Sequence, residues 1–180
     1  MATTDKIPNI FLSFLLLSMI IGCNKKHIDS QKWYDDTKAE ILKQANLKAD
    51  SISDFYDKDS SRKCQYSYLK GHLFRECTIK KEGTHGGIDF YFSKDGKFVL
   101  RREICNNDTI LFEGIYYQGG FYGLSTWWKN CDKRQIRSQG LRYKSSEIGI
   151  WKNWDENGIM TTKDYGNIDK LDSMPNIFKR

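Results

Sequence analysis

The chain has 180 residues, and its 29 Lys and Arg against 23 Asp and Glu give a formal net charge of +6 at pH 7. With 14% aromatic residues and only 2 prolines, it has the composition of a strand-rich globular domain, which excludes a largely disordered chain. Its length suits one domain with a sizeable core, and its charge favours anionic lipid, acidic glycans or an acidic protein as a partner.

The N-terminus carries an apolar run over residues 10–21. This run has the length of a signal-peptide core and is shorter than the ~20 residues of a membrane span. It ends in Ile20-Ile21-Gly22-Cys23, which resembles a bacterial lipobox. The resemblance implies that residues 1–22 are a lipoprotein-type signal peptide and that lipidated Cys23 anchors the mature protein to a membrane of the bacterial cell envelope. A simple cleaved signal and an uncleaved anchor are the alternatives.

A basic and polar stem, Asn24-Lys25-Lys26-His27, follows the cysteine and suits lipid head groups. Lipoproteins displayed on the surface of some bacteria carry acidic residues at this place. Their absence favours a periplasm-facing position, which we expect to be on the outer membrane. Nucleic acid is not expected as a partner in that compartment.

Residues 23–63 are expected to form the lipid tether, one amphipathic helix and a polar linker. The helix is predicted over residues 30–48 with Ser30 as its N-cap, and residues 51–63 read as the linker. We expect the apolar face to pack on the rest of the protein, and a contact with the membrane surface is the alternative. Helical spacing places on that face Tyr34, Ile41, Leu42 and Ala45, with Trp33 at its edge and Lys38 as a polar intruder.

Residues 64–180 are predicted to form a mainly β domain, an antiparallel meander of stacked β-hairpins with a short irregular C-terminal tail. Short alternating runs recur there, and turn signals such as Asp95-Gly96 and Asn157-Gly158 separate them. The predicted strands are CQYSYL, HLFRECTIK, IDFYFS, KFVLRREI, TILFEGIYY, FYGLSTWW, RQIRSQGLRY, IGIWKNW and IMTTKDY.

A repeat lies within this meander. The pattern Gly114-Ile115-x-Tyr117-x5-Gly123-Leu124-x3-Trp128 returns 26 residues later as Gly140-Leu141-x-Tyr143-x5-Gly149-Ile150-x3-Trp154, and a partial copy begins at Gly87. The pattern resembles MORN-like repeats, as in bacterial MORN-type antitoxin components, over roughly residues 87–166. A hairpin cannot bury its own apolar face, so we expect such units to stack into one long sheet.

Four cysteines besides Cys23 suit an oxidising compartment, and they allow three pairings. A two-residue turn at Lys70-Gly71 places Cys64 directly opposite Cys77, which favours that bridge. Cys105 and Cys131 each adjoin a turn at the same end of the meander. One intervening strand separates them by ~10 Å, beyond disulfide reach unless the two turns curl together.

The sequence offers no catalytic site. His27, His72 and His85 have no neighbour at metal-ligand spacing, so neither a metal nor another cofactor is expected. A Cys–His nucleophile would need a free thiol, which an oxidising compartment disfavours. We therefore expect a protein that is not an enzyme.

Two surface features indicate binding. Side chains alternate between the two faces along a strand, so Trp127 and Trp128 must point to opposite faces of the sheet. Trp151 and Trp154, three residues apart, must also point to opposite faces. The repeat-equivalent Trp128 and Trp154 are expected to pack on the sheet, which leaves Trp127 and Trp151 as candidate exposed contacts. The second feature is the basic segment 129–144, which is either a solvated face or part of an interface. Its candidate contact residues are Arg134, Arg137, Arg142 and Tyr143.

These features lead us to expect a membrane-anchored, non-enzymatic lipoprotein that binds one protein partner. The MORN-like resemblance implies an immunity or antitoxin role, in which the partner is a toxin neutralised in the periplasm. The alternative is an envelope scaffold that binds lipid, peptidoglycan or an envelope complex.

Overall fold

The computed structural model of the protein describes residues 28–56, 62–80, 86–105, 107–131 and 135–179. The predicted signal peptide, the predicted lipidation site Cys23 and the predicted contact residue Arg134 lie outside these ranges. Within them, no helix is both long and apolar enough to cross a membrane.

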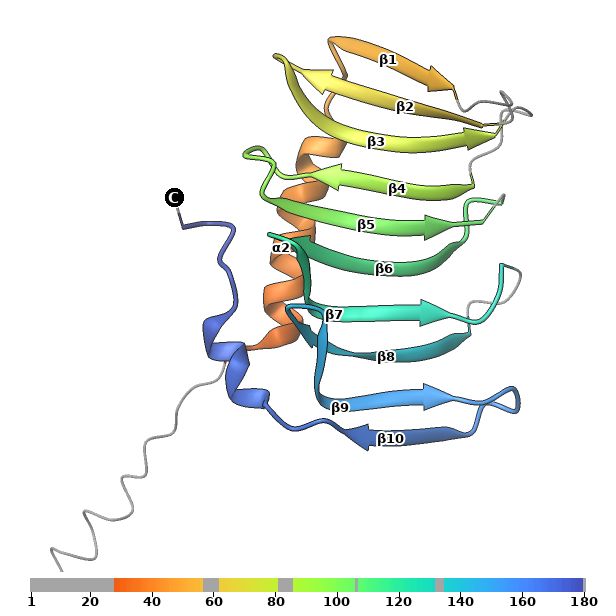
Figure 1. Ribbon diagram of the computed structural model, residues 1–180, viewed down its shortest axis with the longest axis vertical. Coiled ribbons are helices and arrows are strands. Elements are labelled where there is room, and N and C mark those ends of the chain that lie inside the picture. Colours follow the sequence, from red (N-terminus) through yellow and green to blue (C-terminus); the bar gives the residue numbers. More distant parts are fainter. Residues whose placement is uncertain (1–27, 57–61, 81–85, 106, 132–134, 180) are drawn as a thin grey trace, which may run out of the picture.

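Ten strands in the described residues form one antiparallel sheet, in which each strand pairs with its neighbours in sequence (Figure 1). This arrangement confirms the predicted mainly β meander, because every predicted run forms a strand. The strands are β1 (Ser51–Tyr56), β2 (Arg62–Leu69), β3 (His72–Lys80), β4 (Gly87–Phe92), β5 (Phe98–Ile104), β6 (Ile110–Tyr117), β7 (Gly120–Trp128), β8 (Ile136–Tyr143), β9 (Ser146–Trp154) and β10 (Met160–Asp164).

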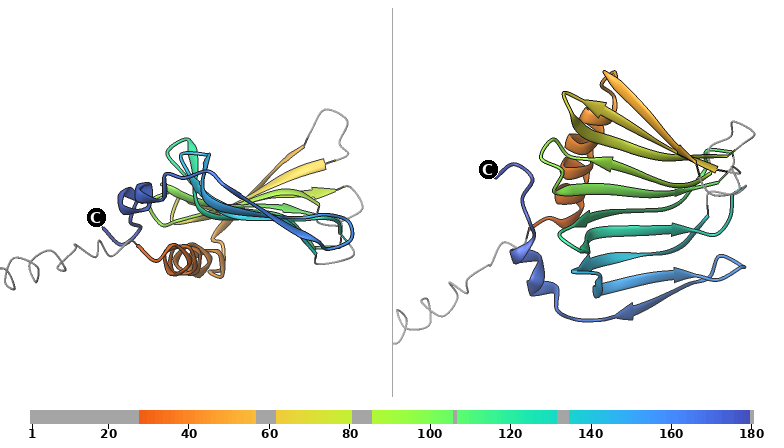
Figure 2. Two further views of the ribbon diagram at one scale, coloured as in Figure 1. Left: turned by 90° about the horizontal axis from the view of Figure 1, so that it is seen from below. Right: turned by 45° about the horizontal axis from the view of Figure 1, so that its top comes forward.

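One helix, α2 (Ser30–Ala45), lies against one face of this sheet (Figure 2). Its N-cap is Asp29 rather than the predicted Ser30, because the Asp29 carboxylate accepts hydrogen bonds from the backbone N–H groups of Gln31 and Lys32 at 3.1 and 3.0 Å. The helix buries Tyr34 and Ile41 in the core with Phe98, Leu100 and Ile115. The helix therefore packs on the β domain, as predicted.

A buried ionic cluster explains why Lys38 lies on the otherwise apolar face of the helix. Glu113 of β6 accepts hydrogen bonds from the Tyr34 hydroxyl at 2.6 Å and from the Lys38 ammonium, while Arg102 of β5 donates to its other oxygen at 2.8 Å. Burial alone would raise the pKa of Glu113, but these hydrogen bonds and the charges of Arg102 and Lys38 outweigh it and lower the pKa. Lys38 thus holds α2 on the sheet.

The C-terminal tail is more regular than expected. Residues 168–173 form a short 3₁₀ helix, η1 (Ile168–Ser173), which buries Leu171. Leu171 and Met174 form a second apolar cluster with Tyr122 and Ile148. The Trp33 indole N–H donates to the Pro175 carbonyl at 2.6 Å, which ties the tail to the first turn of α2.

The predicted linker also contains a strand. Residues 51–56 form β1, which pairs with β2 in regular register from Ser51 opposite Tyr68 to Tyr56 opposite Lys63. All six residues of β1 are exposed. An edge strand with no helix over it needs no apolar face, so its sequence resembles a polar linker. The sheet therefore begins at residue 51, within the predicted linker.

The preferred cysteine pairing is wrong. The β2–β3 register shifts by one residue between Ser67 and Tyr68, so Cys64 lies opposite Thr78 and Cys77 opposite Gln65. A one-residue shift places the two thiols on opposite faces of the sheet, and both are free.

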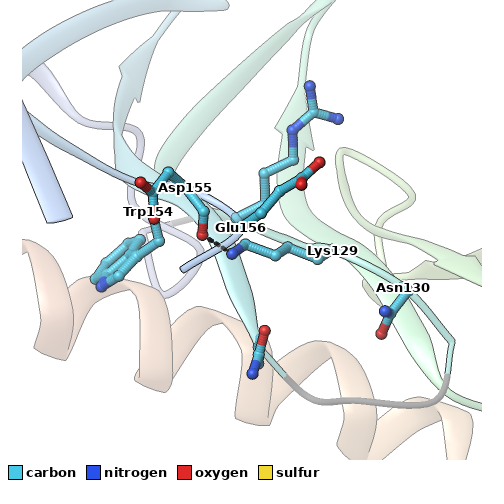
Figure 3. A pocket seen from close by; sticks show the side chains of 7 residues that line it. Lys129, Asn130, Trp154, Asp155 and Glu156 are labelled. Atoms are coloured by element: carbon cyan, nitrogen blue, oxygen red, sulfur yellow. Dashed lines mark hydrogen bonds between the residues drawn. The ribbon is translucent and has the colours of Figure 1, made fainter. Parts of the chain in front are cut away.

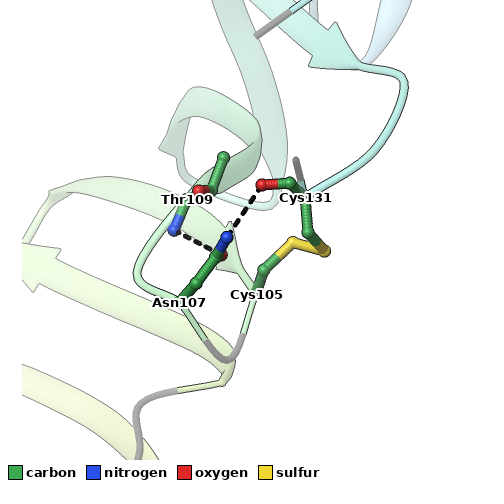
Figure 4. Close-up of a disulfide and its surroundings, with 4 residues drawn as sticks. All are labelled: Cys105, Asn107, Thr109 and Cys131. Carbon is green, nitrogen blue, oxygen red and sulfur yellow. Dashed lines mark hydrogen bonds between the residues drawn. A yellow bond between two sulfur atoms is a disulfide. The ribbon is translucent and has the colours of Figure 1, made fainter. Parts of the chain in front are cut away.

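The structure instead joins Cys105 to Cys131, with their Cα atoms 5.7 Å apart (Figure 4). The two loops curl together, the condition that this bridge required. The Asn107 side chain holds them, because its amide donates to the Cys131 carbonyl at 2.9 Å and its oxygen accepts from the Thr109 N–H at 3.2 Å.

The repeat corresponds to two hairpins with the same backbone irregularity. The β6–β7 pairing skips residues 123 and 124 of β7, and the β8–β9 pairing skips residues 149–151 of β9 and Gly140 of β8, so the second strand of each hairpin has two extra residues. Each skipped segment begins with a glycine of the repeat, Gly123 at φ +70° or Gly149 at φ +59°. Other residues rarely adopt these angles, so the irregularity accounts for both glycines.

Candidate interaction surface

The face of the sheet opposite α2 is called the open face here. On β6, Glu113 contacts α2 and the neighbouring Phe112 therefore points to the open face. Cross-strand pairing extends this face, because Trp127 of β7 lies opposite Phe112 and Ser138 of β8 lies opposite Trp127. The open face thus runs across the hairpins that carry the repeat.

A row of aromatic rings crosses the open face from β6 to the end of β10. Phe112 lies 4.5 Å from Trp127, Trp127 lies 5.8 Å from Trp151, and Trp151 lies 6.5 Å from Tyr165, all between ring centroids. Gly140 makes room for this row, since a Cβ atom there would lie 2.3 Å from the Trp151 ring. The Trp151 indole N–H donates to the Leu141 carbonyl at 3.0 Å and fixes the ring.

Two arginines lie over these rings. The Arg142 guanidinium is 5.0 Å from the Trp127 centroid and 5.2 Å from that of Trp151. Arg101 lies 5.9 Å from the rings of both Phe112 and Phe121. These distances are within the range of cation–π attraction, so the rings help to hold each guanidinium in place.

Each arginine keeps unused hydrogen-bonding capacity. Arg142 donates to the Ser145 carbonyl at 2.6 Å and lies 3.4 Å from the Glu147 carboxylate, while Arg101 pairs with Glu103 at 2.8 Å. The Nε atoms of both arginines are buried without an acceptor. Burial lowers the pKa of Arg142, and the negative charge of Glu147 offsets part of this effect. The Arg142 guanidinium is therefore partly desolvated.

Arg137 stands between two hollows because of a local bulge. The β7–β8 register shifts between Trp127 and Trp128, and this shift leaves Arg137 outside the ladder, exposed to solvent. On one side it borders a hollow of about 310 Å³. That hollow is also lined by Trp127, Ser138, Arg142, Glu147, Trp151, Asn153 and Tyr165.

The second hollow beside Arg137 lies where the β7–β8 and β9–β10 connections meet (Figure 3). Trp154 and Lys129 face each other across it, and the Lys129 ammonium donates to the Asp155 carbonyl. Its remaining lining is polar: Asn130, Gln135 and Glu156. A cation and an indole thus flank Arg137 on this side as well.

An apolar hollow continues the open face toward β3. Glu76 and Arg101 border it, and burial followed by the charge of Asp89 raises the pKa of Glu76. Its apolar lining is Phe90, Phe92, Val99 and Tyr116. Arg101 joins this hollow to the aromatic row, so one surface extends from β3 to β10.

The structure brings together Trp127, Arg137 and Arg142 of the predicted contact residues. Trp151 is beside them, but its expected exposure is wrong: it is 3% exposed, because it lies in the space left by Gly140 and under Arg142. Tyr143 lies apart from them, since it points to the helix face and packs on Tyr122 with ring centroids 5.3 Å apart.

Sequence reasoning missed half of this surface. The sequence did not indicate Phe112, Phe121 or Arg101, because they lie outside the tryptophan-rich and basic segments. It did not indicate Tyr165, because that residue follows the last strand. Alternation along β5 and β6, combined with their pairing, would have placed Arg101 and Phe112 on one face.

The chemistry of the open face is that of aromatic rings and cations. Within the described ranges, no three His, Cys, Asp or Glu residues are grouped so that they could hold a metal ion. The surface offers rings, cations and a few amides, which suit recognition of another surface.

No known family model matches the sequence, and no curated protein or solved structure matches the chain significantly. What the open face binds is therefore inferred from its own geometry and chemistry.

Proposed function

We propose that this protein is a membrane-anchored, non-enzymatic lipoprotein of the bacterial envelope that binds one protein partner through its open face. In this proposal it acts as an immunity or antitoxin protein that neutralises a toxin in the periplasm. The observation that carries the proposal is the pairing of the half-buried Trp127 with the Arg142 guanidinium, which lies over the buried Trp151 and lines the same hollow as the exposed Arg137.

The composition of this surface supports protein binding. Tryptophan, tyrosine and arginine are enriched at the energetic centres of protein interfaces, where a few residues supply most of the affinity. The rigid stack around Arg142 loses little side-chain entropy on binding, since its rings and guanidinium are already held in place. A partner carboxylate could pair with the exposed Arg137 guanidinium, which forms no ion pair within the described residues.

The lipobox resemblance supports the anchor. Several acyl chains on Cys23 would hold the protein stably at the membrane surface. A tethered binder is then concentrated where a toxin arriving in the periplasm must pass.

Affinity purification of the lipidated protein from its own cells, washed at high salt, tests the proposal. We expect one stoichiometric protein partner, because a desolvated aromatic and arginine interface resists salt screening. Recovery of peptidoglycan, or of lipid alone, would contradict the proposal and support the envelope scaffold.

A charge reversal on the open face sharpens this test. Arg137→Glu should weaken binding of the purified partner at least tenfold, since Arg137 is exposed between both hollows and forms no ion pair within the described residues. Lys152→Glu is the control, because Lys152 lies on β9 opposite Gln139 and points to the other face. Equal affinities for the two variants would exclude the open face as the binding surface.

A further inference from the structure

The two ends of the described chain meet at one corner of the molecule. α2 begins beside the C-terminal segment, to which Trp33 is hydrogen-bonded through Pro175 (Figures 1 and 2). A groove of about 250 Å³ lies between them, and most of its lining surface is apolar. The apolar residues around it are Ile28, Trp33, Met174, Ile177 and Phe178. These residues, with the groove, are called the terminal corner.

The rim of the terminal corner is exposed although it is apolar. Phe178 is 62% exposed and Ile28 is 36% exposed, while Met174 is buried at the floor. The charged groups that line the groove are two carboxylates and one ammonium: Lys32 is paired with Asp36 at 2.7 Å, and Asp29 caps the helix. The corner is therefore suited to an apolar contact rather than to a purely electrostatic one.

We infer that the terminal corner rests in the lipid surface and inserts Ile28 and Phe178 at the boundary between head groups and acyl chains. This inference rests on the lipid anchor of the proposed function, and it is independent of the protein partner. Cys23 precedes Ile28 by five residues. An extended chain spans at most ~3.5 Å per residue, so the lipidated residue would lie within about 18 Å of Ile28.

The short tether favours lipid over other occupants of the corner. It would keep Ile28 within about 18 Å of the lipidated residue, close enough for apolar side chains of the corner to bury about 5–10 Å into the interface. A second copy of the chain would have to reach the same corner between the protein and the membrane.

The same contact would orient the molecule. Near its start α2 lies over β7, where Trp33 lies against Gly123, and from there it crosses the sheet toward β3 and β4. Its 16 residues extend about 24 Å at 1.5 Å per residue. The β1 edge would therefore point away from the membrane, into the periplasm.

Photochemical labelling from the bilayer tests the inference. The lipidated protein is reconstituted into phosphatidylethanolamine and phosphatidylglycerol vesicles that contain a phospholipid with a photoactivatable acyl chain. After illumination, mass spectrometry should find adducts on peptides with residues 28–33 and 174–179. Phe55 of β1 is 66% exposed and is the internal control, since it should stay unlabelled.

Three results would overturn the inference. Vesicle-bound protein without adducts at the terminal corner would show that the lipid alone holds it, or that a second copy of the chain covers the corner. Equal labelling of residues 51–56 would show that the orientation is wrong. A protein that leaves the vesicles would contradict the anchor itself, a failure separate from the loss of a protein partner.

Two matched variants check the role of the side chains. Phe178→Asp should reduce labelling of residues 28–33 several-fold, because a charge at this place opposes insertion. Phe55→Asp should leave that labelling unchanged. Both positions are exposed, so neither change disturbs the core. Equal labelling in the two variants would exclude insertion through Phe178.

Discussion

Gly140 and Gly114 occupy the same position in the two repeated hairpins, yet their surroundings differ. Beside Gly140 lies the Trp151 ring, whereas the repeat equivalent of Trp151 beside Gly114 is Ser125. A Cβ atom at Gly140 would lie 2.3 Å from the centre of a fixed indole, and one at Gly114 would lie 2.9 Å from the tip of the Phe112 ring. Both copies of the repeat have glycine at this position, but the ring beside it is Trp151 in one copy and Phe112 in the other.

Alanine substitutions should reveal this difference. Gly140→Ala is expected to lower the free energy of unfolding by about 3 kcal/mol, at the upper end of the cost of overpacking, because Trp151 must leave its place. Gly114→Ala should cost only about 1 kcal/mol, since the Phe112 ring can shift at its tip. Urea unfolding of both variants measures the difference. Equal losses would mean that Trp151 is not confined by Gly140.

Among the elements, α2 is attached to the sheet by charge as well as by apolar packing. The lowered pKa of Glu113 means that the folded protein favours its ionised form. Its contribution to stability is therefore complete above the ordinary Glu pKa of about 4.3 and is lost as the pH falls through the lower folded value. Helix docking should weaken in acid.

Glu113→Gln tests this dependence. The variant should be about 3 kcal/mol less stable at pH 7, because Arg102 and Lys38 lose their partner, and its stability should change less between pH 7 and pH 3. Glu103→Gln is the control. Glu103 pairs with Arg101 at the surface, so the loss should be below about 1 kcal/mol. Urea unfolding at both pH values is the measurement, and an unchanged acid profile in Glu113→Gln would contradict the assignment.

The loops at the other end of the sheet are held by Cys105 and Cys131, which are 26 residues apart. Cys131→Ser should cost about 3 kcal/mol, because the unfolded chain is no longer closed into a loop. Cys64→Ser should cost far less, since Cys64 is free and only partly buried. The free energy of unfolding of both variants, measured with and without dithiothreitol, distinguishes loss of the disulfide from loss of a free thiol. The reductant should destabilise Cys64→Ser but not Cys131→Ser, and a wild type insensitive to it would contradict the bridge.

Over the described residues, the molecule is an open sheet whose first and last strands are β1 and β10. β1 is the edge more prone to self-association, because its unpaired backbone groups lie beside the exposed side chains of Ile52, Phe55 and Tyr56. Edge strands of this kind pair with other chains unless a charge or a partner blocks them. Self-association of the isolated protein should therefore begin at β1.

Ile52→Lys is expected to reduce self-association at high protein concentration while changing the free energy of unfolding by less than about 0.5 kcal/mol. Ile150→Lys is the control, because the two side chains are similarly exposed, 59% and 60%, and Ile150 lies on β9 inside the sheet. Light scattering and sedimentation measure association. Equal protection by both variants would indicate a general effect of charge rather than an edge effect.

The features that depend on short stretches of sequence were predicted correctly. Alternating strands, turn dipeptides and the apolar stripe of α2 are local patterns, so the meander, its order and the docked helix followed from them. The 26-residue repeat likewise marked the glycines at which the pairing of two hairpins skips residues. Strand alternation together with the repeat singled out Trp127, and the basic segment 129–144 singled out Arg142.

Only the tertiary structure decided the features that depend on one-residue shifts and on contacts across the sheet. The bulge near Ser67 separates Cys64 from Cys77, and the bulge at Trp128 exposes Arg137. Curling loops join Cys105 to Cys131, and β1 forms because β2 offers it an edge. A single extra residue reverses which face a side chain occupies, and its place is set by packing over the whole sheet rather than by the residues beside it.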